Sequence, residues 1–391
     1  MHTLHKSGGQ AARRLIAAIL LMLIFVFPTA AESTADIDEI FREQATDSGG
    51  NALLDTLPEE TRNTLAHLGI TELDANAMQQ ITPDAIWDTV WLNALNALTQ
   101  ALPIAGVILG ILILCSLLEG MRHTADGGGM SDAMGIVGIL ATGGAVLPPL
   151  VGCLNQTMAA AESASVYMTS FVPVYAGVMV STGQVASAAS YQTVMLFAAQ
   201  AVTALLTGVV VPLLIISLAM GMTGSLAGGE GVKLDSLSGS LRSTATWILV
   251  GGVTLFTGLL TLQSIVGGAA DSMTLRTAKL SVSSAVPIVG GPLSEALSTV
   301  QGCLQLLKST LGMFGVIATA GILLPPLFSC AAWSISLSFC SGAAEMSGLP
   351  QMAGMFKAAK GVMGTLIGVL AACGLLMIVG TTIVTMATAG G

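Results

Sequence analysis

Residues 194–218 read VMLFAAQAVTALLTGVVVPLLIISL, a run of 25 residues without a charged side chain. As an α-helix the run would be roughly 37 Å long, which exceeds the ~30 Å hydrocarbon core of a bilayer. Backbone groups inside that core cannot bond to water, so a single spanning segment has to be helical. The stretch therefore predicts a membrane-spanning helix, and the rest of the chain is interpreted around it.

Six further apolar runs flank this one, and none of the seven contains Asp, Glu, Lys, Arg or His. Pro173 lies inside the 17-residue third run, which could be re-entrant, and Pro325-Pro326 lies near the middle of the sixth, which could be kinked or broken. The pattern predicts an all-α fold, a polytopic membrane helix bundle of about six to eight spans. The seven runs are Leu102–Leu118, Met134–Leu154, Tyr167–Gly183, Val194–Leu218, Ala245–Val266, Leu311–Phe339 and Val362–Ala389.

The composition of all 391 residues agrees with this interpretation. Hydrophobic residues make up 53% and charged residues only 9%, whereas a soluble chain needs about 25% charged residues to cover its surface. The net charge is −9, and the 13 Lys and Arg residues form no basic tail or stripe. This excludes a nucleic-acid partner, which requires clustered basic side chains, and leaves membrane lipid as an expected contact.

The N-terminal region resembles a secretory signal. Lys6, Arg13 and Arg14 precede the apolar stretch 15–27, and small residues lead to Ala31, after which we expect cleavage. An uncleaved anchor is the alternative. We expect three regions: a signal peptide at 1–31, an acidic extracytoplasmic segment at 32–100, and a multi-span membrane domain at 101–391 with an amphipathic connector at 267–310.

The acidic segment is predicted to form short helices separated by breakers. Thr82-Pro83 begins the last of them, and Trp87 and Trp91 follow one turn apart. Paired aromatic rings just before a span favour the headgroup layer, so this helix could lie along the membrane surface. An ordinary core stripe of a small helical module is the other interpretation.

The chain carries no motif for catalysis or for a cofactor. GxxxxGK[ST], HExxH, GxSxG and GxGxxG do not occur, and the six cysteines form no CxxC pair or zinc-binding spacing. We therefore expect no enzyme activity, no catalytic residues, no metal and no cofactor. Apolar runs without ionisable groups also disfavour an ion-coupled carrier. Broken helices at the prolines could still form a solute site, so a stand-alone small-solute permease is the alternative to a structural or channel subunit.

Three smaller features bear on packing and orientation. Gln200, the most polar group well inside a run, is expected to make a buried interhelical hydrogen bond. Gly106 with Gly110, and Gly364 with Gly368, have the spacing of helix-packing faces, which serve either the bundle or self-association into a homo-oligomer.

Seven crossings would divide the basic residues equally between the two sides. If the third run does not cross, the cytoplasmic side gains a five-to-three majority, which the positive-inside rule favours.

The connector at 267–310 carries Arg276 and Lys279, three residues apart and therefore on one helix face. These side chains could contact anionic headgroups or the acidic surface of a partner. A merely solvated loop face is the alternative.

Around this connector the sequence resembles the stage III sporulation protein AE family. The resemblance rests on Asp271, on residues 275–279 (LRTAK), on 287–290 (PIVG), on 306–308 (LLK) and on 311–312 (LG). It implies a mother-cell membrane subunit of a transenvelope channel that supports late forespore gene expression, with the other stage III A-operon proteins and the forespore stage II protein Q as partners. The candidate partner or lipid contacts are Arg276, Thr277, Lys279, Pro287, Gly290 and Lys308.

Overall fold

The computed structural model describes residues 49–71, 78, 81–122, 128–226, 231–285 and 290–387, and every element in these ranges is a helix. For residues 274–285 and 290–301 the backbone is described but the side chains are not. The predicted signal peptide at 1–31 lies outside the described residues. The all-α class expected from the sequence is confirmed.

Within the described residues, six stretches are long and apolar enough to cross a membrane, which agrees with the lower end of the predicted count. The third of them begins as α7 and continues through the π-helix η2 into α8. The chain is thus a multi-pass membrane protein. Its long helices are α5 (Pro83–Arg122), α6 (Gly128–Ser181), α7 (Val185–Leu205), η2 (Leu206–Val210), α8 (Val211–Leu226), α9 (Gly231–Ala285), α10 (Gly290–Met346) and α11 (Pro350–Ala387).

The second and third apolar runs are two parts of one helix, α6, which has 54 residues. The prediction that the third run is re-entrant is therefore wrong, because α6 continues through Pro173. The α10 helix continues through Pro325-Pro326 in the same way and is not broken there. A proline removes one intrahelical hydrogen bond, a loss that neighbouring helices in a bundle can compensate.

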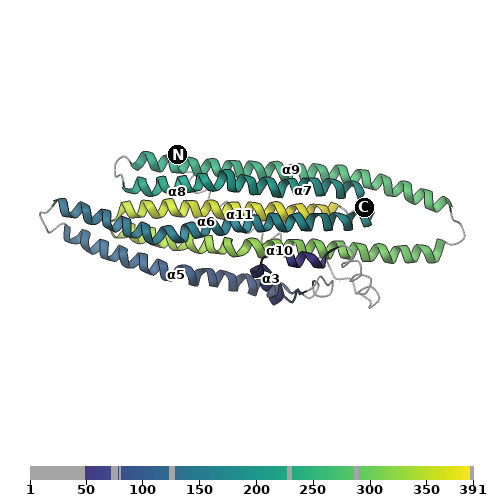
Figure 1. Cartoon of the computed structure of the whole chain (residues 1–391), viewed down its shortest axis with the longest axis horizontal. Helices are drawn as coiled ribbons and strands as arrows, with labels where there is room; N and C mark the ends of the chain where they lie inside the picture. The colour runs from purple at the N-terminus through teal and green to yellow at the C-terminus, as the bar shows by residue number, and fades with distance from the viewer. Residues whose placement is uncertain are drawn as a thin grey trace.

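The long helices run side by side, with α9 along one edge of the bundle and α5 along the other (Figure 1). Helices α10 and α11 pack closely together in the interior, where most of their side chains are buried. We call the end that contains the α6–α7 turn the Gly183 end, and the end that contains the α10–α11 turn the Gly348 end. At the Gly183 end, α9 and α10 extend past the other helices (Figure 1).

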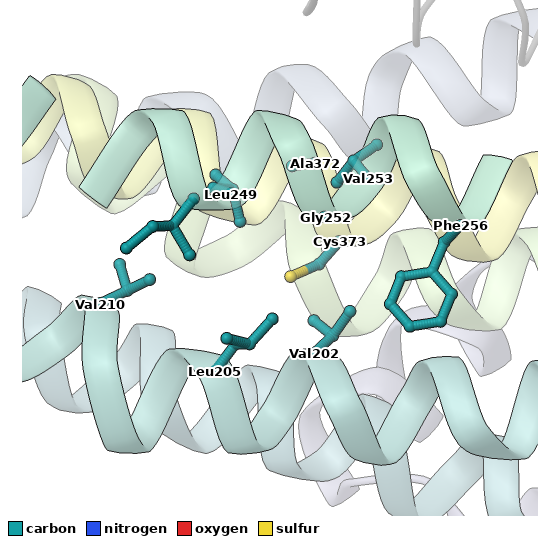
Figure 2. Close-up of a pocket in the computed structure, with 10 residues that line it drawn as sticks. Val202, Leu205, Val210, Leu249, Gly252, Val253, Phe256, Ala372 and Cys373 are labelled. Carbon is teal, nitrogen blue, oxygen red and sulfur yellow. The ribbon is translucent and has the colours of Figure 1, made fainter. Parts of the chain in front are cut away.

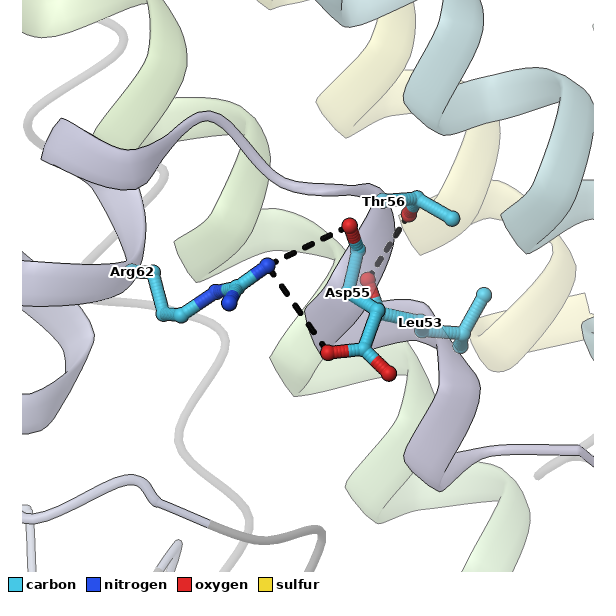
Figure 3. A network of polar contacts seen from close by, with 4 residues as sticks. All are labelled: Leu53, Asp55, Thr56 and Arg62. Atoms are coloured by element: carbon cyan, nitrogen blue, oxygen red, sulfur yellow. Dashed lines mark hydrogen bonds and ion pairs between the residues drawn. The ribbon is translucent and has the colours of Figure 1, made fainter.

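A small N-terminal module, η1 (Asn51–Thr56) and α3 (Glu59–His67), packs against the side of the bundle. A Cβ built on Gly321 of α10 would lie 2.8 Å from Thr61 Cγ2, so glycine is what lets α3 approach α10 this closely. Within the module, Arg62 Nη2 donates to the Asp55 carbonyl at 3.2 Å and lies 3.8 Å from its carboxylate (Figure 3). Both side chains are largely exposed, so this pair adds little stability.

The α5 helix begins at Pro83 and runs without interruption through the predicted domain boundary at Gln100. Trp87 and Trp91, each 56% exposed, therefore lie on the first turns of a spanning helix and not on a separate surface helix. On the exposed face of α5, Thr99 and Gln100 are followed by apolar side chains from Leu102 onward. This change marks where α5 enters the hydrocarbon.

All three tyrosines of the chain lie in one buried aromatic cluster. Phe171 stacks between Tyr167 and Tyr175, at ring-centroid distances of 5.5 and 5.6 Å, and Tyr175 contacts Tyr191 of α7 at 5.4 Å. Within the described part of the chain, none of the three hydroxyls has a hydrogen-bond partner. The cluster is therefore held by ring packing alone, at the cost of burying polar groups.

Candidate functional site

A tight turn joins α6 to α7 at the Gly183 end. Gly183 has φ of +84°, the left-handed conformation that favours glycine after a helix. The Gln184 N–H donates to Met179 O at 3.0 Å, and the Gly183 N–H donates to Val180 O at 2.9 Å, which satisfies the last carbonyls of α6. Gln184 then serves as the N-cap of α7, but its side chain makes no capping bond.

Asp271 of α9 supplies the missing cap. Its Oδ1 accepts from the Ala186 N–H at 2.8 Å, and its Oδ2 accepts from the Ser187 N–H at 3.0 Å. A carboxylate there satisfies two amides that have no intrahelical partner and faces the positive end of the α7 dipole. Asp271 is only 5% exposed, so this bond between distant parts of the chain is shielded from water.

Lys308 of α10 completes the cluster. Its Nζ donates to Gln184 Oε1 at 2.6 Å, and its charge is attracted by the Asp271 carboxylate. The side chain is 4% exposed. Buried charges are tolerated where they are paired and hydrogen-bonded, and these two compensate each other. We call Gln184, Asp271 and Lys308 the polar junction.

Gly267 brings α9 close enough for this contact. A Cβ built there would lie 2.9 Å from Ser187 Oγ and 3.1 Å from Ser187 Cα, so a larger residue would push α9 away from α7. Asp271 lies about one turn further along α9, within reach of the α7 N-terminus. The polar junction thus joins α7, α9 and α10 at the base of the part of α9 and α10 that extends past the bundle (Figure 1).

The structure places the sequence-predicted contacts in different settings. Lys308 is buried in the polar junction, not at a surface that a lipid or partner could reach. Arg276, Thr277 and Lys279 lie in the last turns of α9, but their side chains are outside the described part. Gly290 is the first residue of α10. Pro287 lies outside the described residues. Arg276 and Lys279 therefore remain predicted contacts.

Sequence reasoning missed the capping role of Asp271. In the sequence Asp271 stands out only as part of the family pattern, although a lone acid within the otherwise uncharged stretch 243–275 is itself a signal of a buried polar role. Gln184 gave no signal, because its role depends on the turn geometry. Gln200 was expected to be buried in an interhelical bond, and that is wrong, since it is exposed on α7.

A second polar contact links α9 to α11 towards the Gly348 end. Arg242 Nη1 donates to Ala358 O at 3.3 Å, and its Nε donates to Ser238 O at 3.4 Å. The guanidinium occupies the space that a Cβ on Gly361 would need. Only glycine at 361 leaves room for it, so this contact also holds two helices in register.

The side chains of both clusters form hydrogen bonds that connect neighbouring helices. Their cations donate to carbonyl or amide oxygens, and Asp271 is occupied by two amides. Within the described ranges, no group of three or more His, Cys, Asp and Glu side chains is placed to hold a metal ion. The clusters position helices relative to one another.

A small pocket lies where η2 faces α9 and α11 (Figure 2). Its volume is about 20 Å³ and its lining is apolar, including Leu205, Val210, Gly252 and Phe256. An apolar cavity of that size stays dry and offers a solute no hydrogen bond. We assign it to imperfect packing around the π-helix.

The glycine pairs proposed as packing faces do not pack within the bundle. A Cβ on Gly106, Gly110, Gly364 or Gly368 would meet no atom within 4 Å. Gly106 and Gly110 are exposed on α5. The interpretation that these pairs hold the bundle together is therefore wrong.

Comparison with known proteins gives two matches. Residues 70–388 match the family model described as Stage III sporulation protein AE. The chain is also similar to the Stage III sporulation protein AE of Bacillus subtilis (strain 168), with 26% identity over 294 residues, 74% of this chain and 69% of that protein. No solved structure matches the chain.

Proposed function

Because this chain belongs to the stage III sporulation protein AE family, we propose that it is a membrane subunit of a sporulation transenvelope channel, a secretion-like complex between mother cell and forespore that late forespore gene expression requires. The packing between the described helices carries the proposal. The buried charges Asp271 and Lys308 hold helices together, and the pocket beside η2 is small and apolar. A single copy is built as a scaffold, so any conduit forms between subunits.

The distribution of basic residues supports an orientation for this subunit. On the described helices α5 to α11, five basic residues lie towards the Gly348 end and three lie towards the Gly183 end. The positive-inside rule then puts the Gly348 end in the mother-cell cytoplasm and the N-terminal module outside it, in the membrane around the forespore. The five are Arg122, Lys233, Arg242, Lys357 and Lys360, and the three are Arg276, Lys279 and Lys308.

In this orientation, the extended part of α9 and α10 points away from the mother-cell cytoplasm (Figure 1). Arg276 and Lys279 are suited to meet an acidic surface of the other stage III A-operon proteins or of the forespore stage II protein Q. The sequence has no phosphate-binding loop, so we assign energy supply to a separate subunit and no enzymatic role to this one.

A co-purification experiment tests the proposal. The double change Arg276→Glu, Lys279→Glu reverses two charges and should reduce both co-purification of these partner proteins and sporulation, with the membrane level of the chain unchanged. Lys360→Glu, at the Gly348 end, is the matched control and should leave co-purification intact. Equal recovery of partners with both variants would contradict the proposal.

The alternative, a stand-alone small-solute permease, rested on proline-broken helices. In the described part of the chain α6 and α10 continue through their prolines, so the broken-helix site that motivated it does not form there. Purified protein in liposomes should move no solute by itself. Robust uptake without partners would favour the permease.

A further inference from the structure

One face of α10 carries apolar residues that continue past the end of the helix on which this face packs. Leu307, Leu311 and Phe314 are buried on the face, and Phe314 packs against Tyr167 of α6, with ring centroids 6.4 Å apart. Towards the start of α10 the apolar residues of this face continue at intervals of three and four residues. This is the 3.5-residue period of a helix-packing seam. We call the residues Leu293, Leu297, Val300 and Leu304 the α10 seam.

The α6 helix ends before it can cover the α10 seam. Lys308 Nζ donates to Gln184 Oε1, so Lys308 lies beside the turn that follows Ser181, the last residue of α6. Leu304, one turn further out, is only half-buried, whereas Leu307 is fully buried. The α10 seam therefore lies in the part of α10 that extends past the bundle (Figure 1).

The α10 seam does not belong to a lipid-facing stretch. The part of α10 that is apolar and long enough to cross a membrane begins only at Leu304. Before it, the polar residues Glu295, Ser298 and Gln301 alternate with the seam. This amphipathic pattern is typical of a helix with one side against protein and the others in water, so the seam requires a protein cover.

The chain itself contains a segment of suitable length close to this end. The described part begins at Gly49, where a Cβ would lie 3.8 Å from Val174 Cγ2, seven residues before the end of α6 or roughly 10 Å of helix. The preceding acidic segment at 32–48 has 17 residues, which as a helix would be roughly 25 Å long. Each undescribed stretch after Gly49 has at most six residues, too few for two helical turns.

The sequence of the acidic segment fits the α10 seam in pattern and in charge. Ile37, Ile40 and Phe41 have the spacing of one helix face. Residues 32–48 hold six acids and one base, whereas residues 274–285, the extended part of α9, hold two bases and no acid. Attraction between these opposite charges favours the same end of the bundle as the docking place of the segment.

We propose that residues 36–47 dock on the α10 seam of their own chain as a short amphipathic helix, with Ile37, Ile40 and Phe41 against the seam. The contact covers an apolar face that α6 leaves open and brings the acids of the segment towards the bases of α9. An acidic partner surface would compete for those bases, a consequence that rests on the proposed function. The docking itself does not rest on it.

Disulfide cross-linking tests the proposal in native membranes, with the full-length chain whose six native cysteines are replaced by alanine. Ile40→Cys is combined in turn with Leu293→Cys, Leu297→Cys and Val300→Cys. At least one pair should form a disulfide within one chain after mild oxidation. A protease site placed at 123–127 reveals the link as two fragments that separate only after reduction.

Ile40→Cys with Thr299→Cys is the matched control. Thr299 lies two residues from Leu297 and therefore on the opposite face of α10, so this pair should not cross-link. No more cross-linking from the three seam pairs than from the control, or a disulfide-linked dimer in place of the internal link, would overturn the proposal.

Labelling with a water-soluble maleimide distinguishes the acidic segment from another occupant of the seam. With Leu297→Cys as the only cysteine, the double change Ile40→Asp, Phe41→Asp should raise the labelling rate several-fold, because it removes the apolar contact. Thr46→Asp adds a charge away from the apolar face and should leave the rate unchanged. Equal rates in both chains, as expected if a second copy or another protein covers the seam, would contradict the proposal. Labelling does not depend on partner co-purification, so its failure would leave the proposed function standing.

Discussion

Asp271 of α9 accepts a hydrogen bond from the backbone of Ser187, 84 residues earlier in the chain, with Oδ2 3.0 Å from the amide nitrogen. Asp271→Asn keeps the shape but replaces one acceptor oxygen with a donor, and it leaves Lys308 without a compensating charge. We expect the free energy of unfolding to fall by at least about 2 kcal/mol. The midpoint of thermal unfolding in detergent measures this.

Glu162→Gln is the matched control, since Glu162 is exposed on α6 and its loss of charge should change the midpoint little. Equal midpoints for Asp271→Asn and the parent chain would show that the cap contributes nothing to stability.

A substitution at Tyr175 should raise the stability of the chain. Its hydroxyl is buried without a partner in the described part of the chain, while its ring packs between Phe171 and Tyr191. Tyr175→Phe keeps the ring and removes the unsatisfied group, so we expect stability to rise by about 1 kcal/mol. Phe171→Leu, which removes ring packing and no hydroxyl, should lower it. A destabilised Tyr175→Phe chain would mean that the hydroxyl has a partner after all.

The position of the N-terminal module against α10 can be tested by a designed disulfide. A Cβ on Gly321 would lie 3.9 Å from Thr61 Cβ, within the range found in disulfides. In a chain without its native cysteines, Thr61→Cys with Gly321→Cys should cross-link spontaneously under oxidising conditions. A protease site placed between the two positions reveals the link as fragments that separate only after reduction.

Asn63→Cys paired with Gly321→Cys is the control for that link. Asn63 is exposed on α3, two residues from Thr61, and should not reach Gly321. Cross-linking of both pairs at the same rate would indicate that α3 is not held in one position.

Arg242 and Gly361 should behave as a coupled pair. Gly361→Ala displaces the guanidinium from its bonds to Ala358 and Ser238, and we expect a loss of about 1–3 kcal/mol. In an Arg242→Ala background, the same change should cost much less, because the space is already empty. Thermal midpoints of the four chains give the coupling energy. Additive effects would contradict the contact.

The sequence was sufficient to predict the helical membrane class, because the charge-free run at 194–218 has to be a helix when it crosses a bilayer. It did not predict that two runs form α6. The polar residues between Leu154 and Tyr167 look like a connection, but none of them breaks a helix: Asn155, Gln156 and Glu162 are exposed on α6, and Thr157 and Ser165 are buried.

The site was predicted less well, because burial depends on contacts between distant segments. Lys308 looked like a surface contact and is buried, while Gln200 looked buried and is exposed. The capping role of Asp271 requires the Gly183 turn and the close approach at Gly267, which belong to different helices. The approach of Asp271 to the Gly183 turn, and the closeness of α9 and α7 at Gly267, cannot be recognised from local sequence spacing.

The most direct test of the proposed function measures a late forespore reporter gene in sporulating cells that lack this chain. We expect engulfment to finish, reporter activity to stop at the early level, and the intact chain to restore it. Supplying Asp271→Asn at normal membrane level should restore it only in part. Full late reporter activity and normal spore yield without the chain would contradict the proposed role.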